Sequence, residues 1–250
     1  MNPETGPGVI GKLETSLLAE RTRSVILQAI LDNSFEGKLP AEDDLARMLD
    51  VSRTTVRTAL QGLERDGLIT RQRAIGTTIN RHVPPATLAL QHLVGFDWLL
   101  RSQGHQVDVT VTAVTEEAPM DFRENFELDG GRYLMTDKRY VADGRLVLCV
   151  RDAIPEANLT QADIEPPIPP SLFEFTKRYC SQPIHHAVAR ISAAVKGDAR
   201  YETRLELEDR QPFIRLFETH YASNATVVGH SVIDVDDRFI QLQVFRREPV

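Results

Sequence analysis

Cysteine, tryptophan and long apolar runs are scarce in this chain of 250 residues, which has two cysteines and one tryptophan. The two cysteines, Cys149 and Cys180, are too few for a disulfide framework or a zinc site, and we expect both to be reduced. No apolar stretch reaches the ~20 residues that a transmembrane helix needs, and no signal-peptide pattern is present. These absences favour a cytoplasmic protein that binds no membrane.

The sequence also lacks the short motifs of common enzymes: a nucleophile elbow, a glycine-rich phosphate loop or a metal-spaced cluster. The adjacent His185 and His186 lie in an alternating segment, where neighbouring side chains point to opposite faces of a strand and do not easily chelate one metal. Cys149 lies in the apolar run 146–150 and is expected to pack rather than react. We therefore expect no catalytic residue, no metal and no cofactor.

A net positive charge is lacking too, since 29 Lys and Arg oppose 36 Asp and Glu. The charge is unevenly distributed: residues 1–83 hold 11 of each sign, whereas residues 84–250 hold 18 basic and 25 acidic residues. Residues 53–81 hold six arginines against Glu64 and Asp66, a net charge of +4 (six minus two). Because local charge decides whether a surface contacts phosphate, this segment is compatible with binding to a nucleic acid.

Residues 39–79 are predicted to form two short helices and a hairpin. Ser52 is a natural N-cap for the second helix, Gly67 ends it, and strands 68–71 and 77–79 are closed near Gly76. Apolar residues recur at helical spacing in both helices: Leu45, Ala46, Met48 and Leu49 in the first, and Val56, Ala59, Leu60 and Leu63 in the second. Two helices, a tight turn and a hairpin form a winged helix-turn-helix.

The second helix would fit the major groove of B-DNA, with its N-terminal end at the base edges. Arginine can bind guanine O6 and N7 through two hydrogen bonds, and Arg53 and Arg57 lie four apart on one side of the helix. The predicted DNA-binding residues are Ser52, Arg53, Thr54, Thr55 and Arg57 in the helix, and Arg73, Gly76 and Thr77 in the wing. The alternative is a helical core with solvated arginines, but it does not explain why helix, turn, helix and wing occur together.

The remaining pattern predicts the domain organisation and an α+β fold class with a largely antiparallel sheet. We expect a frayed segment at 1–15, a winged domain at 16–81, a linker at 82–90 and a second domain at 91–250. The buried stripe of the first helix is expected to be Leu17, Leu18, Val25, Ile26, Ala29 and Ile30. In the second domain we expect helices at 96–102, 171–180 and 199–207 and strands at 107–114, 132–141, 145–154, 185–195, 213–221, 227–235 and 239–246, with Asp143-Gly144 as a hairpin turn.

These motifs resemble a known family. Leu39-Pro40, Glu42, Leu45-Ala46, Val51–Arg57, Gly67-Leu68-Ile69 and Gly76-Thr77 stand where the gluconate-repressor (GntR) family of bacterial transcription regulators has them. The second domain resembles the effector-binding UTRA domain of the HutC subfamily, with its chorismate-lyase-like fold, through Ala142-Asp143-Gly144, Ile154-Pro155, Ser171-Leu172-Phe173, Ile191-Ser192-Ala193 and Asp237-Arg238-Phe239. The resemblance implies a homodimeric regulator, interpreted here as a repressor, that binds a pseudo-palindromic double-stranded DNA operator and a small-molecule effector.

Several positions depart from the family pattern. Asp43 stands where an arginine is usual, and Ala74 and Ile75 replace a glycine and a basic residue of the wing, which should weaken backbone and minor-groove contacts. In the second domain, the places of an arginine pair fall on Lys138 and Tyr140. A carboxylate that is common on the following strand falls near Val150 or Arg151.

We expect the effector site where strands 132–141 and 145–154 meet the helix that starts at Ser171. Its predicted residues are Lys138, Tyr140, Arg151, Ser171 and His230. Lysine, arginine and a helix N-terminus favour an anionic metabolite, unless Lys138 and Arg151 are solvated charges of the sheet. Two other functions stay open: an enzyme built on the chorismate-lyase-like fold, and a DNA-binding protein that needs no effector.

Overall fold

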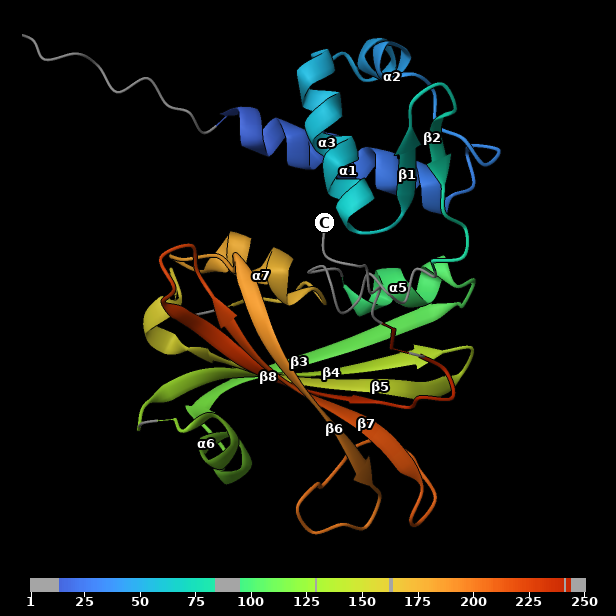
Figure 1. Ribbon diagram of the computed structural model, residues 1–250. Coiled ribbons are helices and arrows are strands. Elements are labelled where there is room, and N and C mark those ends of the chain that lie inside the picture. Colours follow the sequence, from blue (N-terminus) through green and yellow to red (C-terminus); the bar gives the residue numbers. More distant parts are fainter. Residues whose placement is uncertain (1–13, 84–94, 129, 162–163, 241, 244–250) are drawn as a thin grey trace, which may run out of the picture. The chain divides into compact units, whose positions relative to one another are not determined.

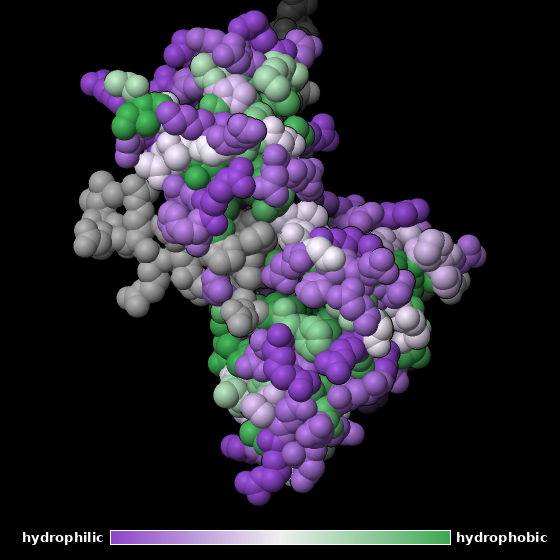
Figure 2. Space-filling view, turned by 90° about the vertical axis from the view of Figure 1, so that its right-hand side faces the viewer, coloured by the Kyte–Doolittle hydropathy of each residue, from purple (hydrophilic) through white to green (hydrophobic). Residues whose placement is uncertain are grey.

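The computed structural model describes residues 14–83, 95–128, 130–161, 164–240, 242 and 243, with side chains from residue 18 onward (Figure 1). The chain divides between Pro84 and Pro85 into two compact units. The predicted frayed segment at 1–15 and most of the predicted linker at 82–90 lie outside the described residues. Figure 2 shows hydrophilic residues over most of the surface in view, with hydrophobic residues between them on the second unit.

The first unit is the predicted winged helix-turn-helix. Its elements are α1 (Glu14–Leu31), α2 (Glu42–Leu49), α3 (Arg53–Arg65), β1 (Ile69–Gln72) and β2 (Gly76–Ile79), and the two strands pair antiparallel. Ser52 caps α3 as predicted, because its hydroxyl oxygen accepts a hydrogen bond from the Thr55 backbone N–H at 3.1 Å. Gly67, with φ +78°, follows the end of the helix in a conformation that favours glycine.

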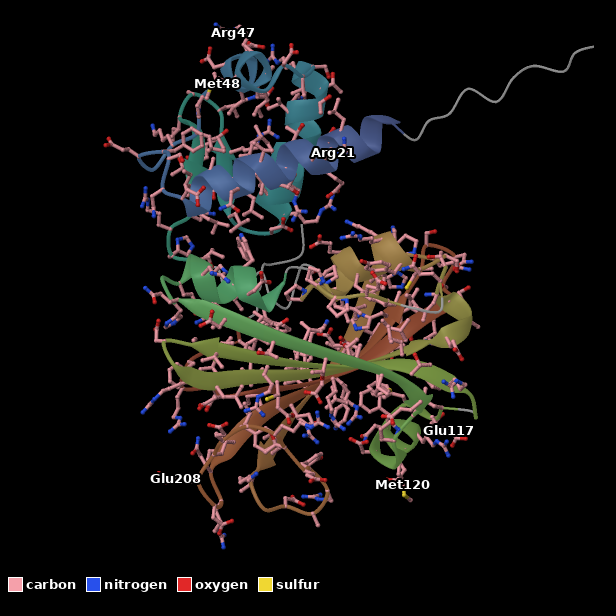
Figure 3. The ribbon with its side chains drawn as sticks, turned by 180° about the vertical axis from the view of Figure 1, so that it is seen from behind. Arg21, Arg47, Met48, Glu117, Met120 and Glu208 are labelled. Carbon is pink, nitrogen blue, oxygen red and sulfur yellow. The ribbon has the colours of Figure 1, made fainter. Side chains whose placement is uncertain are left out.

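The core of the first unit confirms the predicted apolar face of α3, and that of α2 only in part. Val56, Ala59, Leu60 and Leu63 are all buried. In α2 only Leu45 is fully buried, and Met48 is 65% exposed at the outer side of the helix (Figure 3). The helix is only eight residues long, about two turns, and Leu45 is its one fully buried residue.

The predicted buried stripe of α1 is confirmed only in part. Ile26 is buried and Ala29 and Ile30 are half-buried, whereas Leu18 and Val25 are exposed, and Ala19 and Thr22 are buried instead. The side chain of Leu17 lies outside the described part of the chain. Small side chains on both helices allow α1 to approach α3: a Cβ added to Gly62 would lie 2.8 Å from the Arg23 side chain. Arg23 Nη2 also lies 2.5 Å from Asp66 Oδ2, which fixes the rotation of α1.

The second unit is an antiparallel sheet in the strand order β3-β4-β5-β8-β7-β6, with β3 and β6 at its edges (Figure 1). Its elements are α5 (Phe96–Ser102), β3 (Val107–Glu117), α6 (Met120–Phe126), β4 (Arg132–Ala142), β5 (Arg145–Pro155), η1 (Glu156–Asn158), α7 (Leu172–Tyr179), β6 (His186–Val195), β7 (Pro212–Tyr221) and β8 (Val227–Val235). The predicted antiparallel sheet and α+β class are confirmed.

Three details of the second unit differ from the predictions. Helix α6 was missed. Residues 199–207 form no helix, because side chains compete for the backbone: Asp198 accepts a hydrogen bond from the Arg200 N–H and Thr203 accepts one from the Leu205 N–H. The predicted strand at 239–246 is wrong in its described part, because the Phe239 N–H donates a hydrogen bond to the Asp236 carbonyl in a turn. Residues 241 and 244–246 lie outside the described residues.

Strand alternation gives this sheet two different faces. On one face, called the α5–α7 face, Leu99 and Leu100 of α5 pack on one end of the sheet, and Phe175 and Tyr179 of α7 pack on the other. On the opposite face, called the α6 face, Phe122 of α6 and the segment 199–207 cover the strands. Figure 1 shows α5 and α7 on one side of the sheet and α6 on the other.

Candidate nucleic-acid interface and ligand site

The N-terminal end of α3 presents the predicted base-reading arginines to solvent. The Arg53 and Arg57 side chains are 61% and 59% exposed, and Thr54 is exposed beside them. Thr55, by contrast, is only 3% exposed, and its hydroxyl lies 2.7 Å from that of Ser52. The prediction that the Thr55 side chain contacts DNA is therefore wrong, because this threonine belongs to the helix cap and the core.

Glu42, the first residue of α2, brings three arginines together. Its Oε2 lies 3.2 Å from Arg53 Nε and 4.0 Å from Arg57 Nε, and Arg71 of β1 donates to its Oε1. The Glu42 side chain is only 18% exposed, so this carboxylate links α2, α3 and the wing at the base of the exposed surface. Glu42 orients the three arginine side chains. One carboxylate cannot balance the charge of three guanidinium groups, so the surface at the start of α3 keeps a positive charge.

Sequence reasoning named Glu42 as part of the motif but gave it no role. The signal that could have identified it is an acid at the start of a helix, close to an arginine-rich recognition helix. Asp43, which follows it, is 66% exposed and lies 3.4 Å from Arg53 Nη1. This departure from the family pattern therefore acts on a predicted base-reading arginine.

The wing carries the remaining predicted contacts. Arg73 and Gly76 are exposed, and Gly76 adopts φ +94° at the turn. Thr77 is half-buried, and its carbonyl accepts a hydrogen bond from the Leu39 N–H at 2.9 Å. Lys38 Nζ donates to the Ile75 carbonyl at 3.3 Å, so a lysine from outside the hairpin brings positive charge to the place where Ile75 replaces a basic residue.

The structure separates the five predicted effector residues. Lys138 and Tyr140 share the α5–α7 face, and the Tyr140 hydroxyl donates to the Pro170 carbonyl at 3.3 Å, next to Ser171, which caps α7. Arg151 and His230 belong to the α6 face, so the prediction of one pocket with all five residues is wrong. The reason is strand parity: Lys138 pairs with Val150, and the next residue along β5 points to the other face.

Arg151 and His230 have partners of their own on the α6 face. Arg151 forms an ion pair with Asp121 of α6, and its guanidinium carbon lies 5.3 Å from the centre of the Phe122 ring. The His230 ring lies 4.5 Å from that of Phe126. Both side chains therefore help to attach α6 to the sheet.

The positive charge of Lys138 is balanced by a carboxylate inside the protein. It is 2% exposed, and its Nζ lies 2.7 Å from an oxygen of Asp152, which is fully buried. Thr136 and Ser231 each donate a hydrogen bond of 2.6 Å to the same carboxylate. Burial raises the pKa of Asp152, but the Lys138 ammonium and these hydrogen bonds outweigh it and hold that pKa below its usual value.

Asp152 belongs to a row of polar side chains that crosses four adjacent strands on the α5–α7 face. The row, called the polar row, consists of successive cross-strand partners: Thr136 of β4, Asp152 of β5, Ser231 of β8 and Glu218 of β7. It lies between the apolar cluster under α5 and the one under α7. Sequence reasoning missed it, although an acid within the apolar strand 145–154 is a usable signal.

His220 lies beside the polar row, two residues after Glu218 on β7. It is 1% exposed, its Nε2 lies 2.8 Å from Ser231 Oγ, and the Phe173 ring of α7 lies 6.1 Å away. Burial lowers the pKa of His220 to about 4, so the ring is neutral at pH 7. Burial, and next the charge of Asp152, raise the pKa of Glu218 to about 7.

A winged helix-turn-helix with exposed arginines at the start of α3 defines a DNA-binding regulator. Residues 18–79 match the family described as "Bacterial regulatory proteins, gntR family". Residues 18–79 of this chain therefore form a DNA-binding domain of the gntR type, the type found in bacterial transcriptional regulators.

Two relatives are named as transcriptional regulators, and a solved structure shares the fold. The chain is 27% identical over 199 residues to the HTH-type transcriptional regulator GgaR of Escherichia coli K12, covering 78% of this chain and 76% of that protein. It is 32% identical over 103 residues to the histidine utilization repressor of Pseudomonas putida, covering 40% of this chain and 41% of the relative. Its fold is similar to that of the possible transcriptional regulator YydK of Bacillus subtilis, with a TM-score of 0.64 at 17% identity over 92% of this chain and 99% of that one.

Two further findings concern only the part of the chain that the structure describes. None of its helices is long and apolar enough to span a membrane. Nor does that part contain a group of three or more His, Cys, Asp or Glu side chains arranged to hold a metal ion.

Proposed function

We propose that the chain is a homodimeric repressor that binds a pseudo-palindromic operator through α3 and the wing. The observation that carries the proposal is the exposed set Arg53, Thr54 and Arg57 at the N-terminal end of a capped recognition helix. The repressor role rests on the relatives, one of which is named a histidine utilization repressor. A protein that acts on a bacterial operator works in the cytoplasm.

Strand β6 supports dimerisation through the second unit. It is an edge strand, and Val188, Ile191 and Val195 are 61%, 50% and 40% exposed along it. An edge strand with free backbone groups and exposed apolar side chains favours pairing with another strand. Antiparallel pairing of β6 with β6 of a second copy would satisfy two-fold symmetry, and a two-fold dimer presents two recognition helices to two half-sites.

The effector is expected to bind the second unit on the α5–α7 face, close to Tyr140, Ser171 and the polar row. The predicted anionic effector has lost its geometric support, because Lys138 is paired with Asp152 and Arg151 lies on the other face with Asp121. Binding would act by favouring one of two pre-existing arrangements of the protein.

A footprint on the operator, combined with sedimentation of the full chain, tests this function. We expect protection of two inverted half-sites one helical turn apart, roughly 10 base pairs from centre to centre, by a species of twice the chain mass. Protection of a single half-site by a monomer would contradict the dimer. Binding with no sequence preference would favour a DNA-binding protein that needs no effector.

Glu42→Gln should change the character of DNA binding. The substitution removes the charge that orients Arg53, Arg57 and Arg71, so sequence-independent binding should become stronger and its salt dependence steeper. We expect non-specific affinity to rise a few-fold, about 1 kcal/mol, while discrimination for the operator falls. The measurement is fluorescence anisotropy with operator and scrambled duplexes over a salt series. The matched control is Glu36→Gln, which alters an exposed acid with no ion partner among the described residues.

A further inference from the structure

The hydrogen-bond directions on the α5–α7 face follow from one carboxylate. Asp152 only accepts hydrogen bonds when ionised, so the single Ser231 hydroxyl proton is donated to its Oδ1, 2.6 Å away. Ser231 Oγ must then accept from the N–H at His220 Nε2, 2.8 Å away. A neutral histidine carries one N–H, and in His220 that proton is therefore on Nε2.

His220 Nδ1 is consequently an acceptor, and it has no hydrogen-bond partner among the described residues. An unsatisfied polar atom on a side chain that is 1% exposed is rare, and it points to a partner that binds from outside the chain. Glu218 lies beside this histidine. Its side chain is 15% exposed, its Oε2 lies 3.7 Å from His220 Nε2, and its carboxylate has no ion pair with Lys or Arg among the described residues.

We propose that the Glu218 carboxylate and His220 Nδ1 together bind a protonated nitrogen of the effector, such as a primary ammonium group. This inference rests on the proposed function, because it names the chemical class of the effector for the same unit. The two side chains are alternate residues on one face of β7, and Glu218 Oε2 lies 3.7 Å from the Nε2 side of the His220 ring.

The charges around the polar row favour a cation over an anion. Lys138 is the buried base of this face, and its charge is cancelled by Asp152. Glu218 has no basic partner, and Asp97 of α5 is a further carboxylate that acts on Tyr140. An anion would be repelled by the Glu218 carboxylate, whereas an ammonium group would form a charge-assisted hydrogen bond with it.

The binding site can be tested with three probes that share one carbon skeleton: butylammonium, butyrate and butan-1-ol. In the full chain labelled with ¹⁵N-histidine, His220 Nδ1 should resonate as an unprotonated acceptor and should shift only with butylammonium. Glu218→Gln should weaken butylammonium binding by about tenfold or more, because the charge-assisted hydrogen bond is lost. Glu116→Gln, an exposed acid on the opposite face of β3, should leave the affinity unchanged.

The affinity for butylammonium should also rise with pH. The groups that face Glu218 are Asp152 across the sheet and His220 on its own strand, and the pKa of Glu218 is raised to about 7. Ionisation of Glu218 should therefore strengthen binding by roughly tenfold between pH 6 and pH 8. Binding of butyrate in place of the amine, a protonated Nδ1, or no response of His220 to any probe would overturn the proposal.

A gel-shift assay on the same preparation separates this inference from the proposed function. If the full chain selects its operator but His220 does not respond to butylammonium, the effector class is wrong and the regulator stands. If the chain binds no DNA selectively while His220 responds to the amine and Glu218→Gln removes the response, the ligand site stands and the regulatory function is wrong.

Discussion

Arg57→Ala should abolish specific operator binding while leaving the fold intact. A two-contact arginine–guanine pair contributes about 1–3 kcal/mol of discrimination, and a dimer loses the contact twice, so affinity should fall by roughly 30-fold to 10⁴-fold. The side chain is 59% exposed and does not belong to the core, so the melting temperature should stay within a degree or two of the parent. Fluorescence anisotropy with operator and scrambled duplexes measures the loss.

The control for this experiment is Arg21→Ala on α1, which removes the same side chain from an exposed position of the same unit (Figure 3). Its operator affinity should be almost unchanged. If Arg57→Ala weakened operator and scrambled duplexes equally, the residue would contact phosphate and would not read a base. Unchanged operator affinity with unchanged salt dependence would remove Arg57 from the interface.

The recognition helix could be predicted well because its determinants are local. Ser52 caps α3 through a bond to a residue three positions later, and Gly67 follows its end, so both limits of the helix can be read from the sequence. The six strands β3 to β8 of the second unit were predicted for the same reason, since alternation and the Asp143-Gly144 turn act over a few residues.

Features that depend on rotation or parity could not be predicted in the same way. Apolar side chains lie on more than one side of α1, so only its packing on α3 decides that Ala19 is buried and Leu18 is not. In β5 an error of one residue moves a side chain to the other face, which is how Arg151 was assigned to the wrong site.

The polar row lies beyond local reasoning altogether. Ser231 and Asp152 are 79 residues apart in the chain, and their hydrogen bond exists only because β8 lies beside β5 in the sheet. Glu42 is a similar case on a smaller scale, since its partners come from α3 and from β1. In both places the side chains could be identified as charged, but their pairing required the strand order and the helix packing.

Lys138→Met should destabilise the second unit by about 3–5 kcal/mol, because it leaves the Asp152 carboxylate buried without its counter-charge. Chemical denaturation of the full chain, followed by a probe in the second unit, measures the loss. Asp152→Asn in the same chain should recover part of it, since the amide is neutral: its oxygen can accept from one of the two hydroxyls, and its NH2 group can donate to the oxygen of the other. Arg132→Met, which breaks an exposed pair with Glu156, should cost less than about 1 kcal/mol.

The pH dependence separates this charge effect from simple loss of packing. In the parent the pKa of Asp152 is lowered, so its contribution is present at neutral pH and is lost as pH falls through that lowered pKa. Without the Lys138 ammonium, burial should raise the pKa of Asp152 above its unfolded value, so the variant should bind a proton on folding. The stability gap between parent and Lys138→Met should therefore narrow as pH falls from 7 to 5. If the gap in stability stayed constant over this range, Lys138 would stabilise the unit through packing, and the pKa of Asp152 would not depend on the Lys138 charge.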